Sequence, residues 1–183
     1  QTYLEEHKTI SAIDIQAEIL ESYERDMTKY ADSSLSNRII SAFNSIPVQL
    51  AKDNKKFQYK VIARGGTSSI FGEAILWLKN SGIVNQIYKV NPVLPLEMHK
   101  DLASFKLYIS DVGLFVNKAG YPLYQLDLNT TPTMISMGTL IEHYVANELR
   151  QKSYIPYYWE SDGKAKLDFV IQKEMDIIPI EVK

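Results

Sequence analysis

The chain has 183 residues, of which 45% are hydrophobic and 23% are charged, and its net charge at pH 7 is −2. This composition supports one folded domain or two small ones and argues against disorder. The absence of cysteine excludes disulfides, thiolate zinc sites and cysteine nucleophiles. The net negative charge excludes a globally basic surface for nucleic acid. No apolar run reaches the roughly 20 residues of a membrane span, and no signal peptide is visible, so we expect a cytoplasmic protein without a membrane partner.

Three helical patterns and one strand pattern fill the first half of the chain. Apolar residues recur at helical spacing in the first three segments, and a proline-marked loop follows the strand. The patterns predict helices within residues 13–30, 34–51 and 65–82, and a strand over residues 83–90. This order is typical of a winged-helix module, so we predict a winged-helix-like region over residues 1–95.

The ends of these helices carry capping residues. Ser34 or Ser36 is predicted to cap the second helix, Pro47 to bend or end it, and Gly82 to end the third. The third helix has just one basic residue, Lys79, to offer phosphates. We therefore interpret its apolar stripe as core and not as a DNA-recognition surface.

A basic segment lies between the second and third helices. Its five cations fall within thirteen residues and are interleaved with two aromatic residues; they are Lys52, Lys55, Lys56, Lys60 and Arg64. This pattern predicts a nucleic-acid-binding patch, with a solvated charged face as the alternative. The segment "GGTSS" that follows lacks the spacing of a nucleotide P-loop, so this chain alone should not hydrolyse ATP.

The second half of the chain predicts a helix and three strands. The segment "MGTLIEHYVANELRQK" has a helical apolar period over residues 137–152. Three strand-like segments follow, at residues 154–161, 167–172 and 177–183. We place the boundary between the two halves at residues 91–101, so that residues 101–183 form the second region.

Acidic residues and a lysine in this region could form a metal site. Glu181 and Lys183 project to one face of the last strand, about 7 Å apart, and Asp168 on the neighbouring strand could meet Glu181 across the sheet. Two carboxylates suit Mg²⁺, whose bound water is activated for attack on a phosphodiester. Helical periodicity places Glu142 at the rim of the packed helix face. Charges that protect an edge strand from pairing are the alternative.

Several segments occur in one order that resembles a known family. They are "ILESYERDMTKYA", "FNSIPVQLAKDNKKFQYK", "FGEAILWLKNSGIV", "FKLYISDVGLF" and "LDFVIQKEMDIIPIEVK". The whole chain resembles the C-terminal region of prokaryotic AAA-type ATPases, in which a P-loop ATPase module precedes a domain of unknown function. That module is absent here. The resemblance therefore implies an upstream ATPase module as partner, with ATP bound only there.

The last part of the chain also resembles the restriction-endonuclease superfamily, whose core places a helix glutamate, then an Asp, then Glu-x-Lys. The resemblance implies Glu142, Asp168, Glu181 and Lys183 as catalytic residues, with Mg²⁺ held by Asp168 and Glu181. Lys166 departs from the pattern, because "AKLDF" stands where relatives read "AEVDF". A positive charge there would compete with a metal or contact phosphate.

The predicted architecture is thus α+β, with a winged-helix-like half followed by a restriction-endonuclease-like half. The superfamily core continues past Glu-x-Lys into a helix and a strand, so we expect this chain to be part of a longer protein. Three functions stay open. The first is Mg²⁺-dependent phosphodiester cleavage, and the second is non-catalytic binding of DNA or protein on an inactive nuclease scaffold. The third is a structural role, with the segment "RDMTKYA", residues 25–31, packed against the ATPase.

Overall fold

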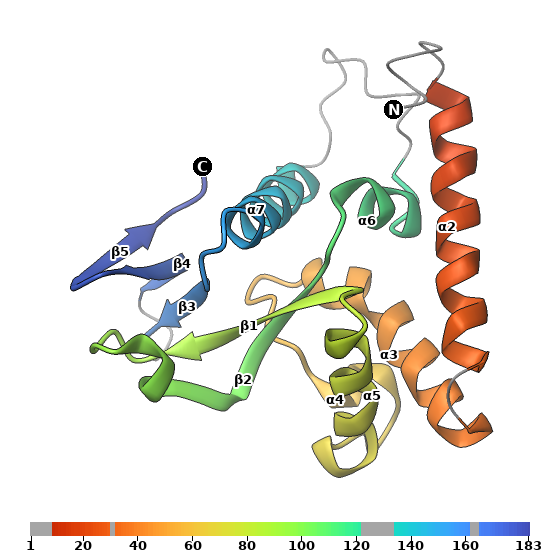
Figure 1. The fold of residues 1–183 in the computed structure, drawn as a ribbon, viewed down its shortest axis with the longest axis horizontal. Helices are drawn as coiled ribbons and strands as arrows, with labels where there is room; N and C mark the ends of the chain where they lie inside the picture. Colours follow the sequence, from red (N-terminus) through yellow and green to blue (C-terminus); the bar gives the residue numbers. More distant parts are fainter. Residues whose placement is uncertain (1–8, 30–31, 122–133, 162–164) are drawn as a thin grey trace.

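The computed structural model describes residues 9–29, 32–121, 134–161 and 165–183, and it has a mixed α+β architecture (Figure 1). The helices are α2 (Thr9–Lys29), α3 (Ser33–Leu50), α4 (Tyr59–Ile62), α5 (Ser68–Asn80), the 3-10 helix η1 (Leu96–His99), α6 (Val112–Lys118) and α7 (Met134–Gln151). The strands are β1 (Val84–Val90), β2 (Lys100–Ile109), β3 (Tyr157–Glu160), β4 (Lys166–Lys173) and β5 (Asp176–Ile180).

The five strands form one sheet in the order β2-β1-β3-β4-β5. The neighbours pair antiparallel except β1 and β3, which run parallel and meet at Lys89 and Tyr158. Strands from both halves of the chain therefore share a single sheet. The boundary predicted at residues 91–101 covers the segment that joins β1 to β2, including η1, and the first two residues of β2. A separate winged-helix-like half and a separate nuclease-like half remain predictions.

The predicted helices are present, but one cap differs from the prediction. Asp32, and not Ser34 or Ser36, is the N-cap of α3: its Oδ1 accepts the backbone N–H groups of Ser34 and Leu35, both at 2.9 Å. A carboxylate can serve both free donors at once, and it also favours the positive end of the helix dipole. The helix therefore begins at Ser33.

Pro47 does not end α3, which continues to Leu50. The proline costs one hydrogen bond near the C-terminus, and the helix keeps its packing because Ile46 and Leu50 on either side are buried. In α5 the residues Phe71, Ala74, Ile75 and Leu78 are buried, as predicted for a core-facing stripe. Gly82 follows the end of α5 with a φ of +74°, which confirms it as the residue that terminates the helix.

Two apolar clusters cover the sheet. The larger gathers buried side chains from α2, α3, α5, α6 and α7 and from β1 and β2, with Tyr158 and Phe169 from β3 and β4. The smaller consists of Val90, Leu96, Tyr157 and Val170, and η1 contributes to it. In Figure 1, α7 and α3 with α5 lie on different sides of the β1–β2 hairpin. None of the described helices has the length and hydropathy of a membrane span.

Replacing Asp32 tests its assignment as the N-cap of α3. Asp32→Ala should lower the free energy of unfolding by about 1 kcal/mol, because two helix N–H groups lose their acceptor. Urea unfolding followed by circular dichroism measures the change. Ser34→Ala is the matched control and should change stability by less than about 0.5 kcal/mol. Equal losses in the two variants would contradict the assignment of Asp32 as the cap.

Candidate functional site

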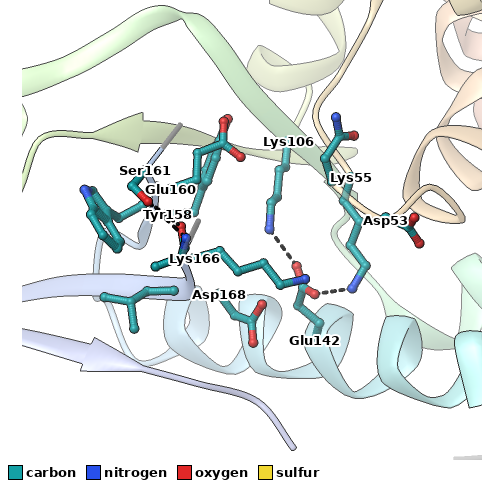
Figure 2. Close-up of a pocket in the computed structure, with 13 residues that line it drawn as sticks. Asp53, Lys55, Lys106, Glu142, Tyr158, Glu160, Ser161, Lys166 and Asp168 are labelled. Atoms are coloured by element: carbon teal, nitrogen blue, oxygen red, sulfur yellow. Dashed lines mark hydrogen bonds and ion pairs between the residues drawn. The ribbon is translucent and has the colours of Figure 1, made fainter. Parts of the chain in front are cut away.

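A cavity of about 380 Å³ lies between α7, the sheet and the segment that follows α3 (Figure 2). Strands β3 and β4 supply one wall, Lys106 of β2 and Glu142 of α7 the floor, and residues 53–55 the opposite rim. The cavity has seven charged side chains, namely Asp53, Lys55, Lys106, Glu142, Glu160, Lys166 and Asp168. It contains two of the four residues predicted to be catalytic, Glu142 and Asp168.

Glu142 forms the centre of this cluster. Its side chain is 4% exposed, and its Oε1 accepts hydrogen bonds from Lys106 Nζ at 2.9 Å and from Tyr108 Oη at 2.6 Å. Its Oε2 accepts a hydrogen bond from Lys55 Nζ. Glu142 therefore lies deeper than the helix rim predicted from its position among the apolar residues of α7. Figure 2 shows the carboxylate held between the two lysines.

The two ammonium groups decide the charge of Glu142. Burial alone raises the pKa of its carboxyl group, but the charges of Lys106 and Lys55 outweigh burial, with help from the Lys55 and Tyr108 hydrogen bonds, and lower the pKa to about 2. Glu142 is therefore ionised at every physiological pH. A buried carboxylate with two cations and a phenol has its acceptor sites filled, and it acts as an internal counter-ion.

Lys55 reaches the cavity through an unusual backbone conformation. It has a φ of +50°, in the left-handed region, where a residue other than glycine carries a cost of order 1 kcal/mol. Its N–H donates to Lys52 O at 3.1 Å, which closes a tight turn after α3. This turn aims the Lys55 side chain, 15% exposed, at Glu142. The ion pair with Glu142 offsets the backbone strain.

Lys106 and Tyr108 alternate on β2 and therefore face the same side of the sheet. The Lys106 side chain is 7% exposed, and its Nζ lies 4.9 Å from the centroid of the Tyr158 ring. Sequence reasoning missed both residues. The available signal was a lysine inside the apolar strand "FKLYI", because a lysine buried in a strand requires a carboxylate partner.

Asp168 lines the cavity next to an irregularity in the sheet. Tyr157 pairs with Val170 and Trp159 pairs with Leu167, so one residue of β3 lies opposite two residues of β4, Asp168 and Phe169. Lys166 lies two residues before Asp168, so the two share a face of β4, and both line the cavity. Phe169 packs into the core, while Asp168 lines the cavity and its Oδ2 accepts the N–H of Val182 at 2.9 Å.

Glu181 and Lys183 lie outside the cavity. β5 ends at Ile180, and the side chains of Glu181 and Lys183 are 62% and 84% exposed. Their charged atoms are 3.9 Å apart. The structure thus brings Glu142 and Asp168 to one cavity and leaves the Glu-x-Lys pair beyond it. Within the ranges described, no three His, Cys, Asp or Glu side chains are grouped to hold a metal ion.

This arrangement does not fit Mg²⁺ at the predicted residues. The ion needs carboxylate oxygens that are free of other cations. Both Glu142 oxygens have lysine partners, and one Asp168 oxygen is bonded to the backbone. Lys166 also extends over the cavity towards Glu142 (Figure 2). The positive charge that a metal would bring is already supplied by lysines.

The predicted basic patch is divided by the fold. Lys60 and Arg64 are exposed and Lys52 and Lys56 are half-buried, whereas Lys55 turns inward to Glu142. The two aromatic residues of the segment pack inward as well: the rings of Phe57 and Phe105 stack at 5.2 Å, and Tyr59 meets Phe57 edge-on. They are not available for stacking on bases. Any contact of this patch with nucleic acid would be to phosphates alone.

The segment proposed to pack against an ATPase lies at the end of α2. Arg25 is 3.9 Å from Glu21, one turn earlier, and both side chains are exposed. Residues 30 and 31 lie outside the described residues. An exposed pair of this kind contributes little to stability.

Acid should destabilise the protein in two separate pH windows. Burial lowers the pKa of His143 from 6.5 to about 4, and the lysines lower that of Glu142 from 4.5 to about 2. Both groups bind protons more readily in the unfolded chain. Each group therefore makes its full contribution to the free energy of unfolding above its pKa in the unfolded chain. That contribution is lost as the pH falls from the pKa in the unfolded chain to the pKa in the folded protein. We expect losses of roughly 3 kcal/mol from His143 between pH 6.5 and 4, and roughly 3 kcal/mol from Glu142 between pH 4.5 and 2.

Urea unfolding across pH, with two variants, separates these contributions. Glu142→Gln should lower the free energy of unfolding by about 3 kcal/mol at pH 7, because Lys55 and Lys106 lose their counter-ion. In this variant the free energy of unfolding should no longer fall between pH 4.5 and 2. In His143→Gln it should no longer fall between pH 6.5 and 4. Glu148→Gln, on the same helix but paired with Lys152 at the surface, is the control and should alter neither window. An unchanged acid dependence in Glu142→Gln would contradict the counter-ion role.

Comparisons with known proteins divide the chain in two. Residues 137–183 match the family described as a domain of unknown function (DUF4143), which is common in AAA-ATPase-associated proteins. Residues 1–125 match the family described as a domain of unknown function (DUF8612). Searches of the curated proteins and of the solved structures gave no match. Since the longer match spans more than half of its residues, the chain belongs to the family described as a domain of unknown function (DUF8612).

Proposed function

We propose that this chain is the C-terminal accessory region of a prokaryotic AAA-type ATPase, and that it acts there as a non-catalytic binding module on a nuclease-like scaffold. The DUF4143 match supports the first part, because that domain is common in AAA-ATPase-associated proteins. The observation that carries the second part is the occupied carboxylate of Glu142, whose three donors are Lys55, Lys106 and Tyr108.

The scaffold assignment rests on the order of the elements and on the positions of the acidic residues. A helix, α7, is followed by three antiparallel strands, β3, β4 and β5. Glu142 lies on the helix and Asp168 on the second strand, and both line one cavity. This order agrees with the nuclease resemblance of the sequence. Similarity of scaffold does not by itself carry the chemistry.

The charge of the cavity supports binding without catalysis. A metal ion at Glu142 would have to displace two ammonium groups, which would then lie buried without a counter-ion. Breaking one buried ion pair in this way costs about 3–5 kcal/mol. Lys166, where the family resemblance implies an acid, adds a third cation to the same cavity. Three lysines therefore offset most of the charge of the four carboxylates in the cavity without a metal.

Mg²⁺-dependent phosphodiester cleavage is the second candidate, and one observation favours it. The backbone N–H of Val182 donates a hydrogen bond to Asp168. Since Val182 stands between Glu181 and Lys183, this bond holds the Glu-x-Lys segment next to Asp168. In that function Asp168 and Glu181 would hold the ion, Lys183 would stabilise charge on the phosphodiester, and Glu142 would support them. The function would require Glu181 to approach Asp168 and Lys166 to leave the cavity.

Cleavage and metal binding distinguish the two candidates. Plasmid and single-stranded DNA should stay intact with the protein and Mn²⁺, and calorimetry should give the same weak Mn²⁺ binding for wild type and Asp168→Asn. Lys166→Glu exchanges the third cation for a carboxylate and should strengthen Mn²⁺ binding by about tenfold or more. The control is Lys173→Glu, which makes the same charge change at the exposed end of β4.

Cleavage by the wild type that is lost in Asp168→Asn or in Lys183→Ala would overturn the non-catalytic proposal and establish the second candidate. The partnership with the ATPase is tested separately, by binding of this chain to the ATPase module in gel filtration. Failure of the two to associate would contradict the accessory role.

A further inference from the structure

A second cavity, of about 510 Å³, lies at the ends of two helices. The C-terminal turn of α5 and the segment after it form one side, and the end of α7 with residues 155–157 forms the other. Strand β1 supplies the floor through Asn85, Gln86 and Tyr88. Its volume is in the range of small-ligand sites, roughly 300–1,000 Å³. It shares no lining residue with the cavity around Glu142.

This second cavity has an excess of positive charge. Its lining includes three cations, Lys79, Lys100 and Arg150, and a single carboxylate, Glu97. Glu97 is already engaged, because it is bonded to Lys100 and its Oε2 accepts a hydrogen bond from Tyr157 Oη at 2.6 Å. Lys79 and Arg150 are exposed and form no ion pair with any carboxylate of the described residues. Lys79 and Arg150 therefore face the cavity without a carboxylate in direct contact, and Glu97 is the one carboxylate in the lining.

The cavity around Glu142 differs from this second cavity in its net charge. There, three lysines face four carboxylates, and a bound phosphate would meet a net negative charge. The whole chain also has a net charge of −2. A local positive cavity on an acidic protein concentrates anions at one place. An anionic ligand should therefore choose the cavity at the ends of α5 and α7.

The helix dipole explains why cations lie at the ends of α5 and α7, but it does not explain why the two ends line one cavity. Lys79 and Arg150 each lie in the last turn of their helix, where a cation offsets the partial negative charge of the helix end. This effect explains a cation on each helix. It does not require the two helix ends to open on one cavity, which is a consequence of the packing of α5 and α7 against β1.

The other groups of the cavity fit a ligand with a flat polar ring beside its phosphate. The Tyr88 ring has Lys79 Nζ at 5.8 Å and Lys100 Nζ at 5.4 Å from its centroid. The amides of Asn80 and Gln86 offer hydrogen bonds nearby. Tyr88 also packs edge-on against Phe105 and donates its hydroxyl to Gln86 Oε1, so we assign it no stacking role. Cations for phosphate and amides for the edge of a base are parts of a nucleotide site.

We propose that the cavity between the ends of α5 and α7 binds the phosphate group of a nucleotide or of a nucleic-acid strand, through Lys79 and Arg150 with Lys100. The proposal rests on the proposed role as a binding module and names its ligand class. The predicted patch at residues 52–64 is the competing location, because Lys60 and Arg64 are also exposed cations.

Fluorescence anisotropy with a labelled single-stranded oligothymidylate tests the proposal, with AMP and inorganic phosphate as competitors. Replacing both Lys79 and Arg150 by Gln should raise the Kd about tenfold. It should also reduce the slope of log K against log salt by about 1.4, for two lost phosphate contacts on a single strand. The double variant Lys60→Gln with Arg64→Gln removes the same charge outside the cavity and should change the Kd less than about twofold.

Glu97→Gln gives a change in the opposite direction. It removes the carboxylate of the cavity but keeps an oxygen that accepts the Tyr157 hydroxyl, so affinity for the oligonucleotide should rise a few-fold. Competition by AMP as strong as that by the unlabelled strand would identify a nucleotide site. Competition by the strand alone would identify a nucleic-acid site.

Three results would overturn the proposal. They are equal Kd values for wild type and the Lys79/Arg150 variant, a larger effect of the Lys60/Arg64 variant, and no binding of either oligonucleotide or AMP by the wild type. In each case the non-catalytic accessory role would still stand on the Mn²⁺ and ATPase-binding results, so the two proposals can fail independently.

Discussion

The buried carboxylate of Glu142 is the interaction on which the rest of this structure depends. It joins three segments that are far apart in sequence: the turn at Lys55, the strand at Lys106 and Tyr108, and helix α7. Removing one partner of a buried ion pair leaves an uncompensated buried charge, which is strongly destabilising. We therefore expect the three segments to pack together cooperatively. Glu142 belongs to the DUF4143 match, whereas its three partners belong to the DUF8612 match. The two matched regions therefore depend on each other for charge balance.

The same helix carries a polar stripe that fixes its position on the sheet. Thr139, Glu142, His143 and Asn147 of α7 are all buried, around a buried Ala146. His143 Nε2 and Asn147 Nδ2 both reach Ile109 O, at 2.6 and 3.1 Å, and Asn147 Oδ1 also accepts a hydrogen bond from Asn85. An apolar helix could slide or rotate with modest loss of packing. A helix held by these directional bonds has one position, because any other leaves buried polar groups unpaired.

This stripe explains what the sequence could predict and what it could not. Hydrophobic period predicted the helices of both halves and the last three strands, because those elements do bury apolar faces. It misplaced Glu142, since a helical projection assigns polar residues to the outside, whereas α7 faces the sheet with polar ones. Lys55 looked like a member of a surface patch because its inward direction depends on a left-handed turn and on a partner 87 residues away. Asp168 was expected at the site, and it lines the cavity on the same face of β4 as Lys166.

The two cavities show that position in the fold, more than residue type, decides what a lysine can do. Lys100 and Lys106 lie six residues apart on β2, and each has a carboxylate partner, Glu97 or Glu142. Lys106 is opposite the middle of α7, where desolvation makes a counter-ion obligatory and the pair turns inward. Lys100 lies near the end of β1, where Lys79 and Arg150 arrive from two helix ends and only Glu97 balances them. Solvent at that end lowers the cost of uncompensated cations, and so leaves a positive charge that a ligand can use.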